Sequence, residues 1–519
     1  MTSFNQTLHI LRKDVRHLYP EITVSLSLVA LFAWIAPAVW PGYLTKMAYP
    51  GAQVGAPPLM AVLLHLLVPL SWLILISRVV HDESLVGDKQ FWVTRPYTWY
   101  SLLAAKLIFI GGLICLPMLA AQMFLVHYAG LPVLSNLPGL LANIGSIAVF
   151  FLLPFTVLAS VTSSFGPLIL LILGGLLYLG LVGLLGTYLQ GSHAVPPYAL
   201  VGWVVLTALI LIGILLYQYI ERKTGLSQLL LIWTPIVTVA LLLMAPAGIL
   251  FAHAYPEGTT VAAKVDLDPM QQQLSGGGPL LVGKNMVMTL PLEVTGVPDG
   301  GLVESNALRV ELISASGFHW LSPWQNSGDM MRNGPTRVDM EIPATVVERI
   351  GSETVKVRLS LALEHLAPET PVAFQIDEAD HTVPGAGVCS LVGEPGFGQP
   401  VCRYALRSPL TFVETEVQNG MCPLDGSAPT TPGSPARAGI GMHHNVFSFD
   451  PVQAQGLRFE VGGDSPEHPH LHALCAGARV QMRASHEAGG EQIHVEQTGI
   501  EITPYLKHRA VFSPVPPPQ

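Results

Sequence analysis

Three groups of residues in this 519-residue sequence have types and spacings that could do chemistry. The first, GPLLVGKN at 278–285, nearly matches the G-x-x-x-x-G-K-[ST] loop that cradles nucleotide phosphates. Asn285 stands where that loop needs a hydroxyl group for magnesium, and no strand–loop–helix pattern surrounds the segment. We therefore expect no nucleotide site here and no ATP hydrolysis by this chain alone.

The second group consists of histidines in the C-terminal half. His468, His470 and His472 alternate in HPHLH, as residues on one face of a strand do, and His443 and His444 are adjacent. These imidazoles could bind a metal if the strands bring them together, but histidine clusters are more often solvated polar surface. We expect solvated polar surface here and no metal site; His468, His470 and His472 are the candidates if a metal does bind. No G-x-S-x-G or H-E-x-x-H motif indicates a hydrolase.

The third group is the cysteines. Cys115 lies alone in an apolar run, where a thiol serves as a small packing residue. The other four, Cys389, Cys402, Cys422 and Cys475, all lie in the polar half, and an even number fits two disulfides in an oxidising compartment. Four cysteines allow three pairings, of which we place Cys389–Cys402 first because it closes the short loop CSLVGEPGFGQPVC. Four reduced cysteines are the alternative, and without a C-x-x-C pair a zinc site is disfavoured.

The elements that position these groups follow from composition. The chain is 50% hydrophobic and 12% charged, too apolar for an ordinary soluble enzyme. Residues 1–252 carry a net charge of +4, so the chain total of −9 leaves −13 on residues 253–519. A membrane span needs roughly 20 apolar residues, and seven such runs lie at 22–40, 58–77, 102–126, 138–160, 166–186, 199–219 and 229–252. The boundary near 160–167 also allows one long broken hairpin.

The positions of the basic residues predict the orientation of these spans. With the N-terminus in the cytoplasm, the inside segments hold most of the Lys and Arg residues, whereas the outside loops hold only Lys46. Seven spans then place everything after about residue 253 outside the cytoplasm. Before the first span, residues 1–21 show apolar residues at helical spacing with bases between them, which predicts an amphipathic helix lying on the membrane surface.

The polar half predicts an all-β, sandwich-like extracytoplasmic domain. Apolar and polar residues alternate over strand-length runs at 287–296, 307–315, 354–365, 409–417, 445–452 and 479–485. We therefore divide the chain into an interfacial helix, an α-helical transmembrane domain, a linker, a β-rich domain of one or two sandwich units, and a tail. Their boundaries are 1–21, 22–252, 253–279, 280–512 and 513–519.

The second inside segment, 78–101, is unusually long and mixes charges with aromatic residues. Such a mixture fits a short helix docked on a protein partner, and it equally fits an interfacial helix with Trp and Tyr at the headgroups. The segment and the N-terminal helix resemble the permease subunits of type-2 ABC exporters, in which this region contacts the partner ATPase. The residues that match the family pattern are Glu83, Gly87, Phe91, Trp92, Arg95, Pro96 and Lys106. The likeness covers roughly the first 220 residues; a seventh span and the outer domain are not standard for the family.

The resemblance implies the membrane subunit of an ATP-driven exporter in a bacterial inner membrane. ATP and magnesium would bind a separate cytoplasmic ATPase subunit, which would be coupled to this chain through the cytoplasmic segment 81–100. The chain would pair with itself or with a second permease chain, among membrane lipids and without nucleic acid. An alternative is a membrane-anchored envelope sensor or scaffold whose outer β-domain binds a protein or glycan. A third is a membrane enzyme with its active site among the outer-domain histidines. The sequence does not specify the cargo.

Overall fold

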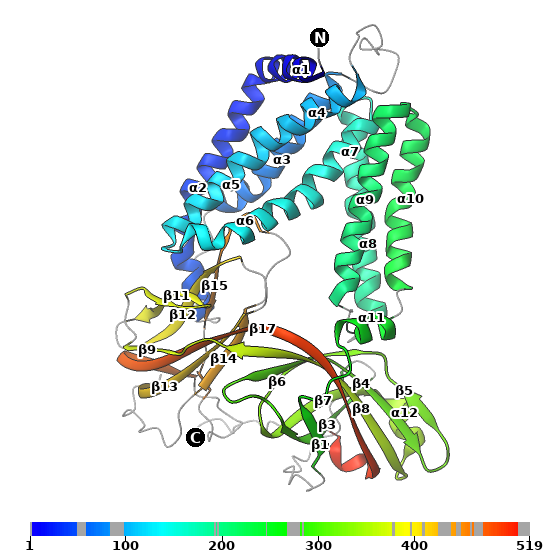
Figure 1. Cartoon of the computed structure of the whole chain (residues 1–519), viewed down its shortest axis with the longest axis vertical. Coiled ribbons are helices and arrows are strands. Elements are labelled where there is room, and N and C mark those ends of the chain that lie inside the picture. The colour runs from blue at the N-terminus through cyan, green and yellow to red at the C-terminus, as the bar shows by residue number, and fades with distance from the viewer. Residues whose placement is uncertain are drawn as a thin grey trace, which may run out of the picture.

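A computed structural model gives the fold of this chain (Figure 1). The residues that it describes are 3–48, 59–83, 98–190, 194, 197–244, 247–266, 281–282, 285–375, 379–394, 397–406, 411–423, 437–442, 448–456, 459–460 and 471–506. Helices form the N-terminal half and strands form the C-terminal half, and the two parts lie end to end in Figure 1. A helical membrane domain followed by a β-rich domain is therefore confirmed.

The helical domain consists of α1 and a series of long apolar helices. Their bounds are α1 (Ser3–His17), α2 (Tyr19–Ala48), α3 (Leu59–His81), α4 (Trp99–Ile110), α5 (Leu116–Tyr128), α6 (Val133–Ile147), α7 (Leu153–Val161), α8 (Phe165–Gln190), α9 (Pro197–Glu221), α10 (Thr224–Leu243) and the short α11 (Ala247–Ala254). In the described residues six helical passes are long and apolar enough to cross a membrane, which makes this a multi-pass membrane protein. The remaining predicted run, 166–186, falls in α8, whose segment Phe165–Tyr178 is apolar.

Two of the passes contain a π-helical segment just before a proline. η2 (Gly111–Cys115) joins α4 to α5, and η3 (Ala148–Leu152) joins α6 to α7. Pro117 and Pro154 follow at the first positions of α5 and α7. A proline has no N–H and its ring clashes with the preceding turn, so a wider turn before it lets the helix continue across the membrane. The break between α7 and α8, at residues 162–164, separates two helices.

In its described residues the β-domain forms two packed sheets. The first is a four-stranded sheet of β1 (Ala262–Val265), β2 (Leu281–Val282), β3 (Asn285–Thr295) and β7 (Gly334–Pro343). The second is a 13-stranded sheet that includes β4 (Leu302–Ser314), β5 (His319–Leu321), β6 (Gln325–Met331), β8 (Thr354–Pro368), β9 (Val372–Gln375), β10 (His381–Val383), β11 (Gly387–Glu394), β12 (Phe397–Ala405), β13 (Thr411–Pro423), β14 (Arg437–Met442), β15 (Val452–Gly456), β16 (Phe459–Glu460) and β17 (Leu471–Glu501). A helix, α12 (Ala344–Ile350), and a short 3-10 turn, η4 (Thr503–Tyr505), complete it.

β17 connects the two halves of this domain (Figure 1). Its first half pairs with β9, β12, β13 and β16, and its second half pairs with β8, which in turn pairs with β4. Between β3–β7 and β4–β8–β17 lies a sandwich core of buried aliphatic residues, among them Leu290, Val338, Leu361 and Val495. The alternating runs of the sequence therefore bury one face, as a packed sheet requires.

Two of the predicted boundaries differ from the structure. The run 445–452 is predicted as a strand, but β15 begins only at Val452, and Ser448–Asp450 form a bend that leaves the sheet. Part of the predicted linker is a strand: β1 pairs antiparallel with β3. In the nucleotide-loop look-alike, Leu281–Val282 pair with Asn285 and Met286 in a hairpin. Within the described residues this segment therefore has strands on both sides and no helix.

Candidate functional site

The site that we consider functional lies at the end of the helical domain that carries α1, opposite the β-domain, and we call it the α1 end (Figure 1). Helix α1 is amphipathic, and the residues that it buries against the protein are Thr7, Ile10, Asp14 and, just after it, Leu18. Phe4 and Leu8, which belong to the predicted apolar stripe, are exposed. α1 thus presents a polar-containing face to the protein and leaves apolar side chains for a membrane surface.

Four charged side chains lie together where α1 packs on the rest of the helical domain, and we call them the ion cluster: Lys13, Asp14, Glu83 and Lys106. The Lys106 ammonium lies 2.7 Å from the Asp14 carboxylate and 2.9 Å from that of Glu83. Lys13 lies 2.7 Å from Glu83 and 3.3 Å from Asp14. The side chains of Lys106 and Asp14 are 1% exposed and that of Glu83 is 6% exposed, whereas Lys13 is 34% exposed. Three of the four charges are therefore neutralised almost out of water, and Lys13 closes the cluster toward the solvent.

The ion cluster connects three elements that flank the long segment between α3 and α4. Glu83 follows the end of α3, Lys106 lies on α4, and Lys13 and Asp14 come from α1. Residues 84–97 lie outside the described part of the chain, but Glu83 before them and Thr98 after them are both placed. The ion cluster therefore holds together the elements that precede and follow this segment.

Hydrogen bonds add to this fixation on the α4 side. The Ser101 hydroxyl donates to the Ser3 carbonyl at 3.2 Å, and the Thr7 hydroxyl donates to the Ser101 carbonyl at 3.4 Å. The Thr98 hydroxyl donates to the Ser101 hydroxyl at 2.8 Å. These bonds hold the start of α4, which directly follows residues 84–97 and Thr98, against α1.

The ends of other helices are joined at the same level. His81, the last residue of α3, lies 3.1 Å from the Thr162 hydroxyl just after α7. The Gln228 amide of α10 donates to the Val161 carbonyl at 2.9 Å. A buried apolar cluster that includes Ile10 of α1 and Tyr219 of α9 packs behind the ion cluster. A displacement of the Glu83 region would therefore reach α1, α4, α7 and α9.

The surroundings shift the pKa values of Glu83 and Lys13 toward their charged forms. Burial alone would raise the pKa of Glu83, but the charge of Lys106 and hydrogen bonds from Lys13 and Lys106 outweigh it and lower the pKa. Burial likewise opposes the charge of Lys13, and the hydrogen bond and charge of Glu83 outweigh it and raise the pKa. Ionised Glu83 thus contributes stability that is fully present above its ordinary pKa of 4.5. This stability is lost as the pH falls through the lowered pKa of Glu83 in the folded chain. The Lys13 contribution is present below 10.5 and is lost as the pH rises through its raised value.

The structure brings together two of the residues chosen by resemblance, Glu83 and Lys106, as a buried ion pair. The others, Gly87, Phe91, Trp92, Arg95 and Pro96, lie outside the described residues. Sequence reasoning missed Asp14 and Lys13. A signal was present: Asp14 is the only acid in residues 1–20, and an acid is out of place on a helix meant for an anionic lipid surface.

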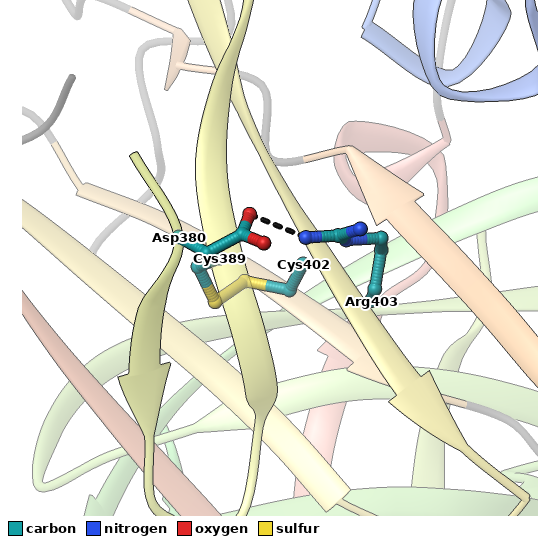
Figure 2. The surroundings of a disulfide bond; sticks show 4 residues. All are labelled: Asp380, Cys389, Cys402 and Arg403. Atoms are coloured by element: carbon teal, nitrogen blue, oxygen red, sulfur yellow. Dashed lines mark ion pairs between the residues drawn. A yellow bond between two sulfur atoms is a disulfide. The ribbon is translucent and has the colours of Figure 1, made fainter. Parts of the chain in front are cut away.

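The predicted disulfide is confirmed. Cys389 and Cys402 occupy paired positions on β11 and β12 and are bonded, and an ion pair between Asp380 and Arg403 lies beside them (Figure 2). Cys115 is a half-buried free thiol.

The other sequence candidates in the β-domain stay predictions. Cys422 lies on β13 opposite Ala473 of β17, and Cys475 follows on β17; their side chains lie outside the described residues. So do His443, His444, His468 and His470, and the side chain of His472.

Comparison with known proteins gives little. No protein-family model and no curated protein matches the chain. One similar solved structure is the C-terminal globular domain of an oligosaccharyltransferase from Pyrococcus abyssi, 13% identical and with a TM-score of 0.11. The match covers 41% of this chain and 44% of that chain, so less than half of that structure is spanned. A TM-score this low carries no argument about fold or function.

Proposed function

We propose that this chain is the membrane-spanning permease subunit of an ATP-driven ABC-type exporter, and that a separate cytoplasmic ATPase subunit acts on the segment between α3 and α4. The observation that carries the proposal is the ion cluster. It ties both ends of the segment, at Glu83 and at Lys106 on α4, to α1 by buried contacts. A push on the segment would therefore move the helices as rigid bodies instead of being absorbed locally.

The proposal includes an orientation. The α1 end faces the cytoplasm, in agreement with the Lys and Arg residues near it, and the β-domain lies outside. In this arrangement ATP and magnesium bind the partner subunit, and the membrane is the bacterial inner membrane. A second copy of this chain, or a second permease chain, completes the pathway.

The test is to purify the full chain from its native host and to determine whether a protein with a complete ATP-binding cassette co-purifies with it. Replacement of 84–97 by a Gly-Ser linker, and the milder Arg95→Glu, should abolish co-purification and the ATP hydrolysis of the purified complex. Lys223→Glu is the matched control, because it makes the same reversal of charge at an exposed base between α9 and α10. Association that survives the linker replacement would show that the segment does not couple the chain to an ATPase.

The alternative of an envelope sensor or scaffold has one observation in its favour. The β-domain contacts the helical domain in the described residues: β11, β12 and β15 pack on α2, and Phe251 of α11 stacks on Trp324. A ligand bound by the β-domain could therefore influence the helices. If no ATP-binding cassette protein co-purifies with the chain and the β-domain binds an envelope protein or glycan, this function replaces the exporter.

A further inference from the structure

A short piece of the β-domain is bound within the helical domain. Ser448, Phe449 and Asp450, which precede β15, lie among α2, α3, α5, α6 and η3 and not in the sheet. We call these three residues the inserted segment, and the helical side chains that hold it the receptor. The receptor consists of Trp40, Trp72, Gln122, Asn143 and Phe151.

The receptor binds the main chain of the inserted segment as a peptide-binding site does. The Asn143 amide nitrogen donates to the Ser448 carbonyl at 2.7 Å, and its carbonyl oxygen accepts the Ser448 N–H at 2.9 Å. The Gln122 amide nitrogen donates to the carbonyls of Ser448 and Phe449 at 3.3 and 3.4 Å. Hydrogen bonds to main-chain groups are independent of the side chains of the bound peptide, so these bonds contribute affinity without selecting a sequence.

Two side chains of the inserted segment add specificity. The Phe449 ring lies 5.7 Å from that of Trp72 and 5.8 Å from that of Phe151, between centroids. The Trp40 indole N–H donates to the Asp450 carboxylate at 3.0 Å. An aromatic residue followed directly by an acid is therefore the pattern that this receptor reads.

The contact combines apolar and polar groups: Phe449 and Val452 pack with the apolar core of the helices, and polar side chains of two helices are buried beside them. Gln122 is completely buried and Asn143 nearly so, on helices that cross the membrane, where polar side chains are costly and mark functional positions. Burial also raises the pKa of Asp450 in spite of the Trp40 hydrogen bond, so its charge is held at a cost. Within the described residues, the Gln122 amide oxygen and the Trp72 indole N–H have no hydrogen-bond partner. The inserted segment thus leaves polar groups of the receptor unused.

We propose that the receptor is a peptide-recognition site, and that the chain's own residues 448–450 occupy it as a tethered ligand. The class of external ligand is a peptide whose main chain bends as residues 448–450 do, with an aromatic residue followed by a carboxylate. Such a ligand would displace the inserted segment and release the β-domain from this part of the helical domain. The inference does not depend on an ATPase partner, because it rests on contacts at the other end of the helices.

The test measures binding of a fluorescent peptide with the sequence VFSFDPVQ, residues 446–453, to the full chain in nanodiscs. In Phe449→Ala, which weakens the tethered ligand, we expect saturable binding at least tenfold tighter than to the native chain. Asp450→Ala provides a second release variant. Adding Asn143→Leu to either one should abolish binding, whereas adding Thr156→Val should not, because the Thr156 hydroxyl donates to the Leu152 carbonyl of its own pass and not, among the described residues, to the inserted segment.

A labelled peptide with Ala in place of its second Phe is the specificity control and should not bind. Retention of the Cys389–Cys402 disulfide and of the native elution volume shows that each variant is folded. The proposal is overturned if neither release variant binds the peptide, or if binding persists in the Asn143→Leu variants. It is also overturned if the native chain binds as tightly as the release variants, since the site would then not be occupied.

Discussion

Replacement of Lys106 tests the ion cluster most directly. Lys106→Met keeps the length of the side chain but leaves two buried carboxylates, Asp14 and Glu83, opposite the one remaining base, Lys13. Loss of one partner from a buried ion pair typically costs about 3–5 kcal/mol, because the other charge stays buried and unpaired. We expect a loss of this size in the free energy that holds α1 on the helical domain.

The measurement is hydrogen exchange of the α1 amides in the full chain in nanodiscs. With about 1.4 kcal/mol for each factor of ten, the exchange of α1 should accelerate by roughly two to nearly four powers of ten. The matched control is Lys223→Met, which removes an exposed base 3.6 Å from Glu221. An exposed pair of this kind contributes about 0–1 kcal/mol, so α1 exchange should hardly change.

A double variant separates charge from packing. Asp14→Leu alone leaves an excess buried base, but Asp14→Leu with Lys106→Met removes one charge of each sign and keeps the Lys13–Glu83 pair at 2.7 Å. Well-packed apolar replacement of a buried pair is often neutral, so the double variant should exchange closer to the native chain than either single variant. The reasoning is refuted if Lys106→Met costs less than about 1 kcal/mol, or if the double variant loses as much as the two single variants added together.

Two further predictions concern the β-domain. Burial raises the pKa of Glu364 to about 7; the charges of Glu487 and Glu304 add to this rise and the Asn306 hydrogen bond opposes it. The contribution of Glu364 to stability is therefore present at acidic pH and is lost as the pH rises from 4.5 through about 7. Glu364→Gln should remove this part of the pH dependence, which is measured as the difference between the thermal unfolding curves of the two chains from pH 5 to 8. An unchanged difference across that range would contradict the assignment. Replacement of Cys389 and Cys402 by Ser removes a cross-link between residues 13 positions apart and should lower the free energy of unfolding by about 3 kcal/mol in the chain-entropy account. The measurement is denaturant unfolding, with the native chain under reducing conditions as the control. Equal stability of the oxidised native chain and the variant would show that the disulfide is not structural.

The sequence predicted most of the fold because each half has a strong repeating signal. Apolar runs of span length fall in the membrane helices, and alternating runs such as 354–365 lie inside strands such as β8. The run 445–452 failed for a physical reason: Phe449 satisfies the alternation of a strand, yet its partners Trp72 and Phe151 belong to helices. Periodicity indicates that a side chain is buried, and it does not indicate which domain buries it.

The candidate sites were less predictable, because they depend on contacts between distant parts of the chain. Glu83 and Lys106 were chosen by resemblance, but the ion pair of Lys106 with Asp14 joins residues that lie 92 positions apart in the sequence. The partnership of Asn143 with Ser448 spans 305 positions. No local pattern encodes such pairings, since they follow from the packing of whole helices. The Cys389–Cys402 bond, by contrast, was within reach because it lies in one hairpin.

Helix α3 joins the two sites and leads to a final prediction. Trp72 contacts the inserted segment, and His81, nine residues later, ends the helix two residues before Glu83. This part spans about 14 Å of straight helix, and the one proline inside α3, Pro69, precedes it. If this part of α3 moves as a rigid body, the free energies of the contacts at its two ends must be coupled.

The coupling is measurable with Phe449→Ala, Lys106→Met and their combination, using α1 hydrogen exchange as the common readout. If α3 moves as one body, the free-energy change of the double variant should differ from the sum of the two single changes by about 1–3 kcal/mol, the usual range for coupled sites. Leu66→Ala, an exposed position on the same helix before Pro69, replaces Phe449→Ala in the control cycle and should be additive. Additivity within about 0.5 kcal/mol in the first cycle as well would mean that the two sites act independently, because distant residues without a shared structural element show that behaviour.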